Sequence, residues 1–396
     1  MSGALSDIRV LDLSSDVAGP YCARLLGDFG ADVIKVEPPS GEPGRQLEPL
    51  VDGPAGAGAS GFFAFLNTNK RGISLNLESA QGQALFRALA RQADVIVESY
   101  APGYLDDRRI GYDLLDAARP GIILTSITPF GQTGPWRDRP GNDLTVFALS
   151  GWADLNARGG GPPLKGSGHQ AAFVGAVAGF LGAVAALFHR DHTGEGQHVD
   201  VSMLEALTET YGPRFLGAQH GAGPDRPMSP GMTDFMAGPV PCKDGYFSLT
   251  LSRAHFWRDA MTELGLSELA TDELFWNRQL MRKELAPKVE PAIARRGKYE
   301  LFERLSMLRV VSGMVLTTEE LYANLHLRDR GFFVEIDQRS LGKVEMPGAP
   351  FKMTATPAEY RRPAPALGEH TGEVLRELLG LSDEDIEDMR RAGDVA

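Results

Sequence analysis

The chain has 396 residues, of which 43% are hydrophobic and 23% charged, and its formal net charge at pH 7 is −12. This length predicts two domains, and the acidic balance excludes a global positive field that would attract nucleic acid. The only two cysteines, Cys22 and Cys242, are too few for a disulfide framework or a metal site. An anionic ligand would therefore need a local patch of cations.

We expect a cytoplasmic protein that crosses no membrane. The N-terminal residues carry no basic flank or cleavage site before a strand-like segment at residues 8–13. The most apolar stretch, residues 171–188, is dense in Ala and Gly and leads directly into His189-Arg190-Asp191-His192. We interpret this stretch as a tightly packed, buried helix rather than a membrane span.

The first 150 residues alternate short β-branched runs with helical patterns. Strands are predicted at residues 8–13, 33–37, 72–77, 94–98 and 122–127, and helices at residues 79–92 and 112–118. This alternation predicts an α/β fold with a parallel, doubly wound sheet.

Gly- and Pro-rich segments at residues 52–61, 157–168 and 217–241 are predicted to be loops. After the third of these loops, a strand at residues 247–251 and mainly helical patterns to about residue 308 suggest a second domain. We therefore expect a large domain at residues 1–215, a linker with a small α+β domain at 216–330, and a return to the large domain with a tail at 331–396.

General nucleotide-binding motifs are missing from the sequence. No Gly-x-Gly-x-x-Gly follows the first strand, and there is no Gly-x-x-x-x-Gly-Lys-Ser/Thr loop. His-Glu-x-x-His, paired Cys-x-x-Cys and Gly-x-Ser-x-Gly are also missing. General motifs thus predict only an α/β protein that could bind an anion.

A series of longer blocks is more specific. In chain order the blocks include Leu11-Asp12-Leu13-Ser14, Val17-Ala18-Gly19-Pro20, Asp32-Val33-Ile34-Lys35-Val36-Glu37, Asn67-Thr68-Asn69-Lys70-Arg71-Gly72, Thr128-Pro129-Phe130-Gly131-Gln132-Thr133-Gly134-Pro135, Thr193-Gly194-Glu195-Gly196-Gln197 and Leu367-Gly368-Glu369-His370-Thr371. In this order and spacing they resemble the family III CoA-transferases (the CaiB/BaiF or formyl-CoA transferase type) from about residue 6 to about residue 378.

The resemblance implies a Rossmann-like large domain whose parallel sheet is formed from both chain ends, with a smaller domain inserted. It also implies that two chains interlock into a dimer and that each active site lies near their interface. Coenzyme A, as free CoA or acyl-CoA substrate, would lie along the large domain, and no metal is implied.

The same resemblance suggests which residues contact CoA. Val17 and Ala18 belong to the first glycine-containing block, Asn69, Lys70 and Arg71 would approach the nucleotide phosphates, and Arg109 and Ile110 would sandwich the adenine. The alternative is that these basic residues are ordinary solvated surface. Two positions depart from the family pattern, since Ala101 and Pro38 stand where many members have basic residues.

The catalytic position also departs from the family. Family members use an aspartate or glutamate as the nucleophile that attacks the acyl-CoA thioester. Counting back from Arg190 places that acid at Ala172, or at Ala171 with a shift of one residue. Because a methyl group cannot form an anhydride, the chain has no family catalytic residue.

Other residues could supply the chemistry. Asp191 and Glu195 are nearest along the chain but belong to the far end of the predicted helix, whereas Asp143 and Asp154 would need their loops to fold back. His169 is adjacent but is more often structural in such a loop. The racemase branch of the same fold needs a histidine and an aspartate, and its two positions correspond to Asn142 and Ala172.

Three hypotheses follow from this pattern. The first is a non-catalytic subunit that pairs with a paralogous, aspartate-bearing chain, as in the two-subunit succinyl-CoA:benzylsuccinate CoA-transferases that it resembles. The second is a self-sufficient homodimeric transferase with a non-standard nucleophile. The third is an acyl-CoA-binding protein without transfer activity. We favour the first hypothesis, with succinyl-CoA as donor and benzylsuccinate as a candidate acceptor.

Overall fold

A computed structural model of the protein describes residues 3–53, 56–156, 161–212, 214–220, 236, 238–339 and 341–396. Contacts divide the chain into two compact units: unit 1 is Met1–Gly212 with Gly331–Ala396, and unit 2 is Pro213–Arg330. Much of the predicted loop at residues 217–241, and residues 157–160 of the predicted loop at 157–168, lie outside the described residues.

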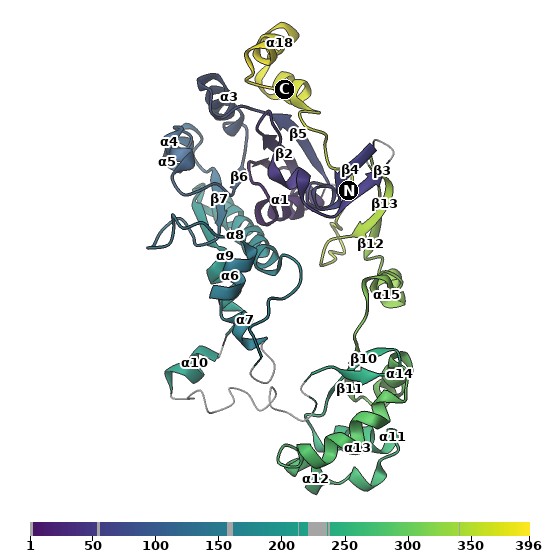
Figure 1. The fold of residues 1–396 in the computed structure, drawn as a ribbon. Coiled ribbons are helices and arrows are strands. Elements are labelled where there is room, and N and C mark those ends of the chain that lie inside the picture. Colours follow the sequence, from purple (N-terminus) through teal and green to yellow (C-terminus); the bar gives the residue numbers. More distant parts are fainter. Residues whose placement is uncertain are drawn as a thin grey trace. The chain divides into compact units, whose positions relative to one another are not determined.

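Unit 1 is built on a six-stranded parallel sheet in the order β5-β2-β1-β6-β7-β8 (Figure 1). The strands are β1 (Arg9–Asp12), β2 (Asp32–Glu37), β5 (Lys70–Ser74), β6 (Val95–Glu98), β7 (Ile123–Thr128) and β8 (His198–Ser202). Leu11 of β1 lies opposite Ile34 of β2 and Ile96 of β6, so the sheet winds outward in both directions from β1. The crevice beyond the carboxyl ends of β1 and β6 is therefore the switch point at which open α/β sheets bind ligands.

The expected α/β class with a large parallel sheet is confirmed, but one detail of the prediction is wrong. All six strands of this sheet precede residue 203, so the C-terminal segment contributes no strand to it. That segment instead adds helices and a separate hairpin, and in this way both chain ends still form unit 1.

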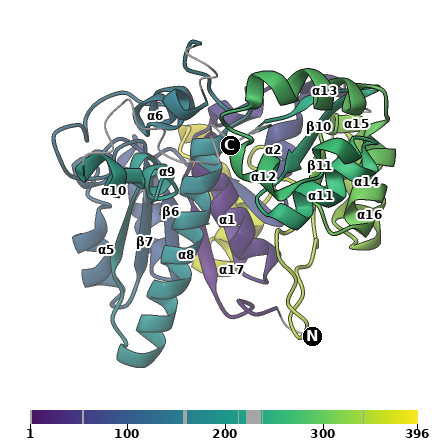
Figure 2. The same ribbon diagram turned by 90° about the horizontal axis from the view of Figure 1, so that it is seen from below.

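Helices cover both faces of the sheet because successive residues of each strand point to opposite faces. Val10 belongs to a core with α1 (Ala18–Asp28), α8 (Gln170–Thr193) and α9 (Met203–Glu209). Its neighbour Leu11 belongs to a second core with α3 (Ala80–Ala90), α5 (Tyr112–Ala118), α17 (Thr371–Leu379) and α18 (Asp383–Ala392). Figure 2 shows α1 and α8 side by side, and they contact each other closely.

The apolar stretch forms α8, but it is not buried all round as the sequence predicted. Most of its Ala and Gly residues are buried, while Val177, Leu181 and Phe188 are exposed. By length and composition α8 could span a membrane, because an 18-residue window has a mean hydropathy of 2.2 and is 44% buried. One such helix is weak support for a span, since core helices of soluble proteins meet the same criteria.

Shorter elements complete unit 1. They are η1 (Pro43–Gln46), β3 (Leu50–Gly53), β4 (Gly56–Ser60), α2 (Gly61–Leu66), α4 (Tyr104–Asp107), α6 (Asp143–Leu149), α7 (Trp152–Leu155), β12 (Phe333–Gln338) and β13 (Gly342–Pro347). The predicted flexible loop at residues 52–61 is wrong in part, because β3 and β4 pair as an antiparallel hairpin. The prediction was based on the Gly- and Pro-rich composition of the segment, but backbone pairing between strands does not depend on the side chains.

Unit 2 has its own hydrophobic core around a three-stranded antiparallel sheet, β11-β10-β9. Its strands are β9 (Val240–Cys242), β10 (Gly245–Thr250) and β11 (Val311–Met314). Its helices are α10 (Arg214–Gln219), α11 (Ala254–Glu263), η2 (Ser267–Leu269), α12 (Asp272–Asn277), α13 (Arg282–Ala294), α14 (Lys298–Met307), α15 (Thr318–Tyr322) and α16 (Leu325–Asp329).

Candidate active site

A cavity of about 470 Å³ lies at the switch point of the parallel sheet. It is lined by the turn after β1 (residues 15–18), by Ser99 after β6, by Pro129 after β7 and by Met203 after β8. The starts of α6 and α8 complete the wall. This position, at the carboxyl ends of parallel strands, is where α/β folds place their ligands.

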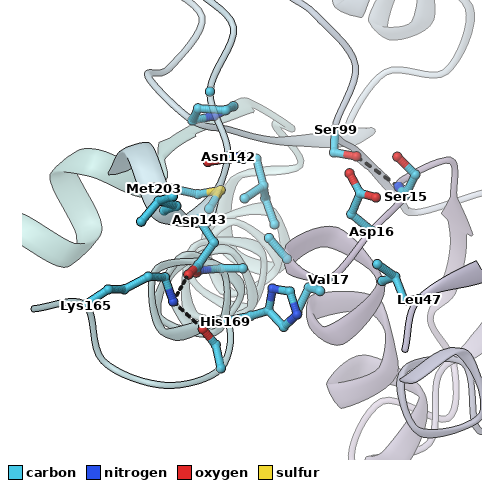
Figure 3. A pocket seen from close by; sticks show the side chains of 17 residues that line it. Ser15, Asp16, Val17, Leu47, Ser99, Asn142, Asp143, Lys165, His169 and Met203 are labelled. Carbon is cyan, nitrogen blue, oxygen red and sulfur yellow. Dashed lines mark hydrogen bonds and ion pairs between the residues drawn. The ribbon is translucent and has the colours of Figure 1, made fainter. Parts of the chain in front are cut away.

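Ala172 lines this cavity in the first turn of α8 and presents only a methyl group to it. Its backbone N–H donates to Oδ1 of Asp143 at 3.0 Å. The other oxygen of that carboxylate, Oδ2, lies 2.7 Å from Nζ of Lys165. Figure 3 shows Asp143 and Lys165 on one side of the cavity.

Lys165 is held by one ion pair and two hydrogen bonds. Its contact with Asp143 is the ion pair, and its ammonium group donates to the carbonyl oxygens of Gly166 and Gly168, which precede α8. Two N–H groups of the lysine thus have backbone acceptors, and its charge is compensated by the Asp143 carboxylate. The sequence analysis stated that Asp143 could act only if its loop folded back toward Ala172. The loop does fold back, but the carboxylate is paired with Lys165.

Asp16 stands on the opposite side of the cavity from Asp143 (Figure 3). Its backbone has φ of 63°, in the left-handed region that Asp and Asn adopt more readily than other non-Gly residues. Its N–H donates to Oε2 of Glu42 at 3.1 Å, and the N–H of Ser15 donates to Oγ of Ser99 at 2.9 Å. The Asp16 carboxylate is exposed and makes no hydrogen bond or ion pair with the residues that the structure describes.

The sequence analysis missed Asp16. The available signal was an acidic residue between Ser15 and the apolar Val17-Ala18 pair, directly after the first strand. The residues it did select there, Val17 and Ala18, both line the cavity. His169 lines it as well, one turn before Ala172, with its ring edge-on to Phe62 at 5.0 Å between centroids.

Lys70 does not fit the expected phosphate contact. Its side chain has no exposed surface, and Nζ donates to Asp12 Oδ2 at 2.7 Å, to the Pro20 carbonyl at 2.8 Å and to Asn67 Oδ1 at 2.9 Å. An ammonium group has three N–H donors, and all three are used. The geometry gives Lys70 a structural role instead.

Arg71 and Asn69 also bind protein groups. Arg71 is nearly buried and pairs with Asp32 at 2.7 Å and with Glu373 and Glu377 of α17 at 3.2 and 2.5 Å. These contacts raise the pKa of Arg71 against the opposing effect of burial. They dock α17 on the edge strand β5 and leave Arg71 poorly placed for a phosphate.

Asn69 joins distant parts of the chain. With φ of 68°, its side chain donates to Asp28 and to the Glu359 carbonyl, each at 2.7 Å, and accepts from the Arg361 N–H at 2.7 Å. The expected phosphate contact of Asn69 does not fit this arrangement, in which the side chain holds the returning C-terminal segment.

The two residues expected to contact adenine differ in their exposure. Ile110 is completely buried in the second core, so it cannot stack on a base without opening that core. Arg109 is exposed, with φ of 57°, and its contact with adenine stays a prediction.

A second cavity of about 230 Å³ lies beside this loop and contains a chain of polar groups. Ser126 Oγ lies 2.8 Å from Nε2 of His198, and burial raises the pKa of the adjoining Glu98 carboxyl to about 7. Among the described residues there is no cluster of three or more His, Cys, Asp or Glu side chains that could hold a metal ion.

Comparison with known proteins identifies the family. The sequence model of CoA-transferase family III matches residues 5–371, which is most of the chain. The chain belongs to this family.

Individual relatives match along nearly their whole length. The chain is 32% identical to the "Succinyl-CoA--L-malate CoA-transferase beta subunit" of Chloroflexus aurantiacus, over 98% of this chain and 96% of the relative. It is also 32% identical to the "Succinyl-CoA:(R)-benzylsuccinate CoA-transferase subunit BbsE" of Thauera aromatica, over 100% of this chain and 99% of the relative. The fold resembles the crystal structure of a CaiB/BaiF family protein from Brucella suis, with a TM-score of 0.85, 27% identity and coverage of 96% of this chain and 100% of that one.

Membership of CoA-transferase family III makes the absence of an acid at Ala172 chemically important. Of the two carboxylates that line the cavity, Asp143 is held by Lys165 and by a backbone N–H, and Asp16 is free. Ala172, at which the sequence analysis expects the family carboxylate, thus lines a cavity in which Asp16 is the one unpaired carboxylate among the described lining residues.

Proposed function

We propose that this chain is a non-catalytic subunit of a heteromeric family III CoA-transferase. The observation that carries the proposal is the Ala172 methyl group in the cavity at the switch point. Transfer by this family needs a carboxylate that attacks the thioester carbonyl, breaks its C–S bond and releases CoA thiolate, leaving a mixed anhydride. A methyl group has no lone pair for the first of these steps.

The partner would be a paralogous chain with Asp or Glu at the position of Ala172. Two relatives of the chain are named as subunits of CoA-transferases, which supports a heteromeric assembly. The exposed stripe of Val177, Leu181 and Phe188 on α8 supports a contact with another chain, because apolar side chains of this size are usually covered. We propose that the two chains interlock.

For the reaction, we propose transfer of CoA from an acyl-CoA, with succinyl-CoA as the donor, to a carboxylic acid. Both subunit relatives are named for succinyl-CoA, and one of them for benzylsuccinate. Benzylsuccinate is accordingly our candidate acceptor. CoA itself would lie at the turn that contains Val17 and Ala18.

A self-sufficient homodimeric transferase is the second candidate function. The observation that favours it is Asp16, whose free carboxylate lines the same cavity as Ala172. In that case Asp16 would carry the anhydride in place of the missing acid.

Co-expression tests the proposal. The chain alone is expected to transfer no CoA between succinyl-CoA and free acids, whereas its complex with an acid-bearing paralogue is active. Replacing the partner's acid by alanine should abolish all activity. Robust transfer by the purified chain alone, lost in Asp16→Asn, would establish the second candidate instead.

A further inference from the structure

The cavity beside Ala172 has an uneven distribution of charge. The titratable residues that line it are Asp16, Asp143, Lys165 and His169. Asp143 and Lys165 neutralise each other at 2.7 Å, and the remaining Lys165 donors are used by backbone carbonyls. With a neutral imidazole, the lining carries one uncompensated charge, the negative charge of Asp16.

The backbone holds Asp16 at this wall. Its N–H is bound by Glu42, whose carboxylate is in turn 3.1 Å from the buried Lys35 ammonium, and the preceding N–H of Ser15 is bound by Ser99. Its left-handed backbone is sparsely populated by residues other than Gly, and such conformations persist where surrounding contacts determine them. The carboxylate can change rotamer, but its Cα cannot leave the wall without breaking these contacts.

We infer that Asp16 makes this cavity select against acyl groups that end in a free carboxylate and admit acyl-CoA thioesters with uncharged acyl groups. The inference rests on the proposed function, because it takes the cavity as an acyl-CoA site. The other described wall residues are mainly apolar, including Val17, Leu47, Ile127 and Met203, and suit a hydrocarbon chain. No free cation among the described lining residues would compensate a second carboxylate.

The consequence is that the two subunits would bind different acyl-CoA thioesters. Like charges a few ångströms apart repel each other even near a protein surface, where the effective dielectric constant is lower than that of bulk water. A succinyl group would meet Asp16 in this chain, so a dicarboxylic substrate would be processed in the cavity of the partner. Succinyl-CoA and the CoA ester of benzylsuccinate each keep a free carboxylate, so both would be bound by the partner, and this chain's cavity would hold only a neutral thioester.

Matched ligands test the inference. Succinyl-CoA and butyryl-CoA have acyl chains of equal length and differ by a terminal carboxylate in place of a methyl group. Their dissociation constants for the full chain would be measured by calorimetry at about pH 8, above the ordinary range of histidine titration, with free CoA as a third probe. Wild type should bind butyryl-CoA at least about tenfold more tightly than succinyl-CoA.

Two variants remove the charge without changing the backbone preference. Asp16→Asn keeps the shape and tolerates the left-handed conformation, and Asp16→Gly is free of strain there. In both variants the two ligands should bind within about twofold of each other. The matched control is Asp154→Asn, which removes the same charge from an exposed residue that does not line the cavity and should keep the tenfold difference.

The difference in wild type should also shrink when salt is raised from about 0.02 M to about 0.5 M, because screening weakens exposed charges. Equal affinities in wild type, or a difference that survives in both Asp16 variants, would overturn the inference, as would failure of wild type to bind any of the three probes. These outcomes are separate from the proposed function, whose test is the loss of transfer on removal of the partner's acid.

Discussion

The ammonium group of Lys70 lies 2.7 Å from Oδ2 of Asp12, and neither side chain has exposed surface. The same carboxylate oxygen is 3.8 Å from Nζ of Lys35. Burial acts to raise the pKa of Asp12, but the two ammonium groups and its hydrogen bonds outweigh burial and hold that pKa below its usual value. This pair links β1 with β5 across β2, so it stabilises the part of the sheet that carries the turn with Asp16.

Replacing Lys70 by methionine should therefore destabilise the fold. The substitution leaves Asp12 as a buried charge without its nearest partner, and breaking such a pair typically costs about 3–5 kcal/mol. The measurement is the free energy of unfolding in urea. Lys343→Met is the control, because Lys343 is exposed, pairs with Glu335 at 3.0 Å and should lose less than about 1 kcal/mol.

The same variant distinguishes the structural role of Lys70 from a phosphate contact. Folded Lys70→Met should bind CoA with nearly the affinity of wild type. A small loss of stability accompanied by a large loss of CoA affinity would contradict the structural role and restore the contact expected from the sequence.

The buried Glu98 carboxyl predicts a pH-dependent stability. Burial raises its pKa from 4.5 to about 7, although hydrogen bonds from Ser126 and from the Tyr100 N–H oppose the shift. The folded state therefore binds more protons than the unfolded state between these values, and stability falls as the pH rises through this range. Glu98→Gln removes the ionisation, so its stability relative to wild type should rise by about 3 kcal/mol between about pH 4 and about pH 8.

Unfolding in urea across this range, with exposed Glu335→Gln as control, measures the effect. The control should follow wild type at every pH. A Glu98→Gln variant whose stability runs parallel to that of wild type would show that Glu98 ionises freely in the folded protein.

The sequence predicted the parts of the fold that depend on local pattern. The β-branched runs correctly indicated strands of the parallel sheet, because strands covered on both faces are continuously apolar. The order of the motif blocks identified the family. Val17 and Ala18, which it suggested as CoA contacts, and Ala172, which it placed at the catalytic position, all line one cavity, and their roles there stay predictions.

The roles of individual cations could not be predicted in this way. Lys70 is hydrogen-bonded to Asp12, which is 58 positions away in the sequence, and Arg71 to Glu377, which is 306 positions away. A pair of basic residues in a loop-like block has the same local pattern whether its partner is a phosphate or a carboxylate. Only the tertiary contacts decide between them, and the same holds for the ion pair that engages Asp143.

The Asp143 carboxylate should stabilise the start of α8. Asp143→Ala leaves the Ala172 N–H without its acceptor and the Lys165 ammonium without its ion-pair partner, and a lost hydrogen bond to a charged group costs about 1.5–3 kcal/mol. Urea unfolding measures this loss. Asp138→Ala is the control, since Asp138 is largely exposed and, among the residues that the structure describes, pairs with its neighbour Arg137 alone. Equal losses in the two variants would contradict the role of Asp143.

Assembly should depend on the exposed face of α8. Leu181 has 67% of its surface exposed and lies between Val177 and Phe188 on that face. Leu181→Glu would place a charge in the proposed interface and should lower the fraction of dimer or heteromer seen by light scattering at least about tenfold. Glu195→Gln, beyond the end of the helix, is the control, and an unchanged assembly in Leu181→Glu would exclude this face from the interface.

Chemical trapping should locate the covalent step in the complex. An acyl-enzyme anhydride, or the thioester formed from it, marks the residue that carries it when it is treated with hydroxylamine or borohydride in the presence of succinyl-CoA. In this chain Ala172 cannot carry the label, and the Asp143 carboxylate is engaged by Lys165 and by the Ala172 N–H. Mass spectrometry should therefore place the label on the partner's acid alone. A label on Asp16, lost in Asp16→Asn and retained in Asp154→Asn, would show that this chain performs its own transfer.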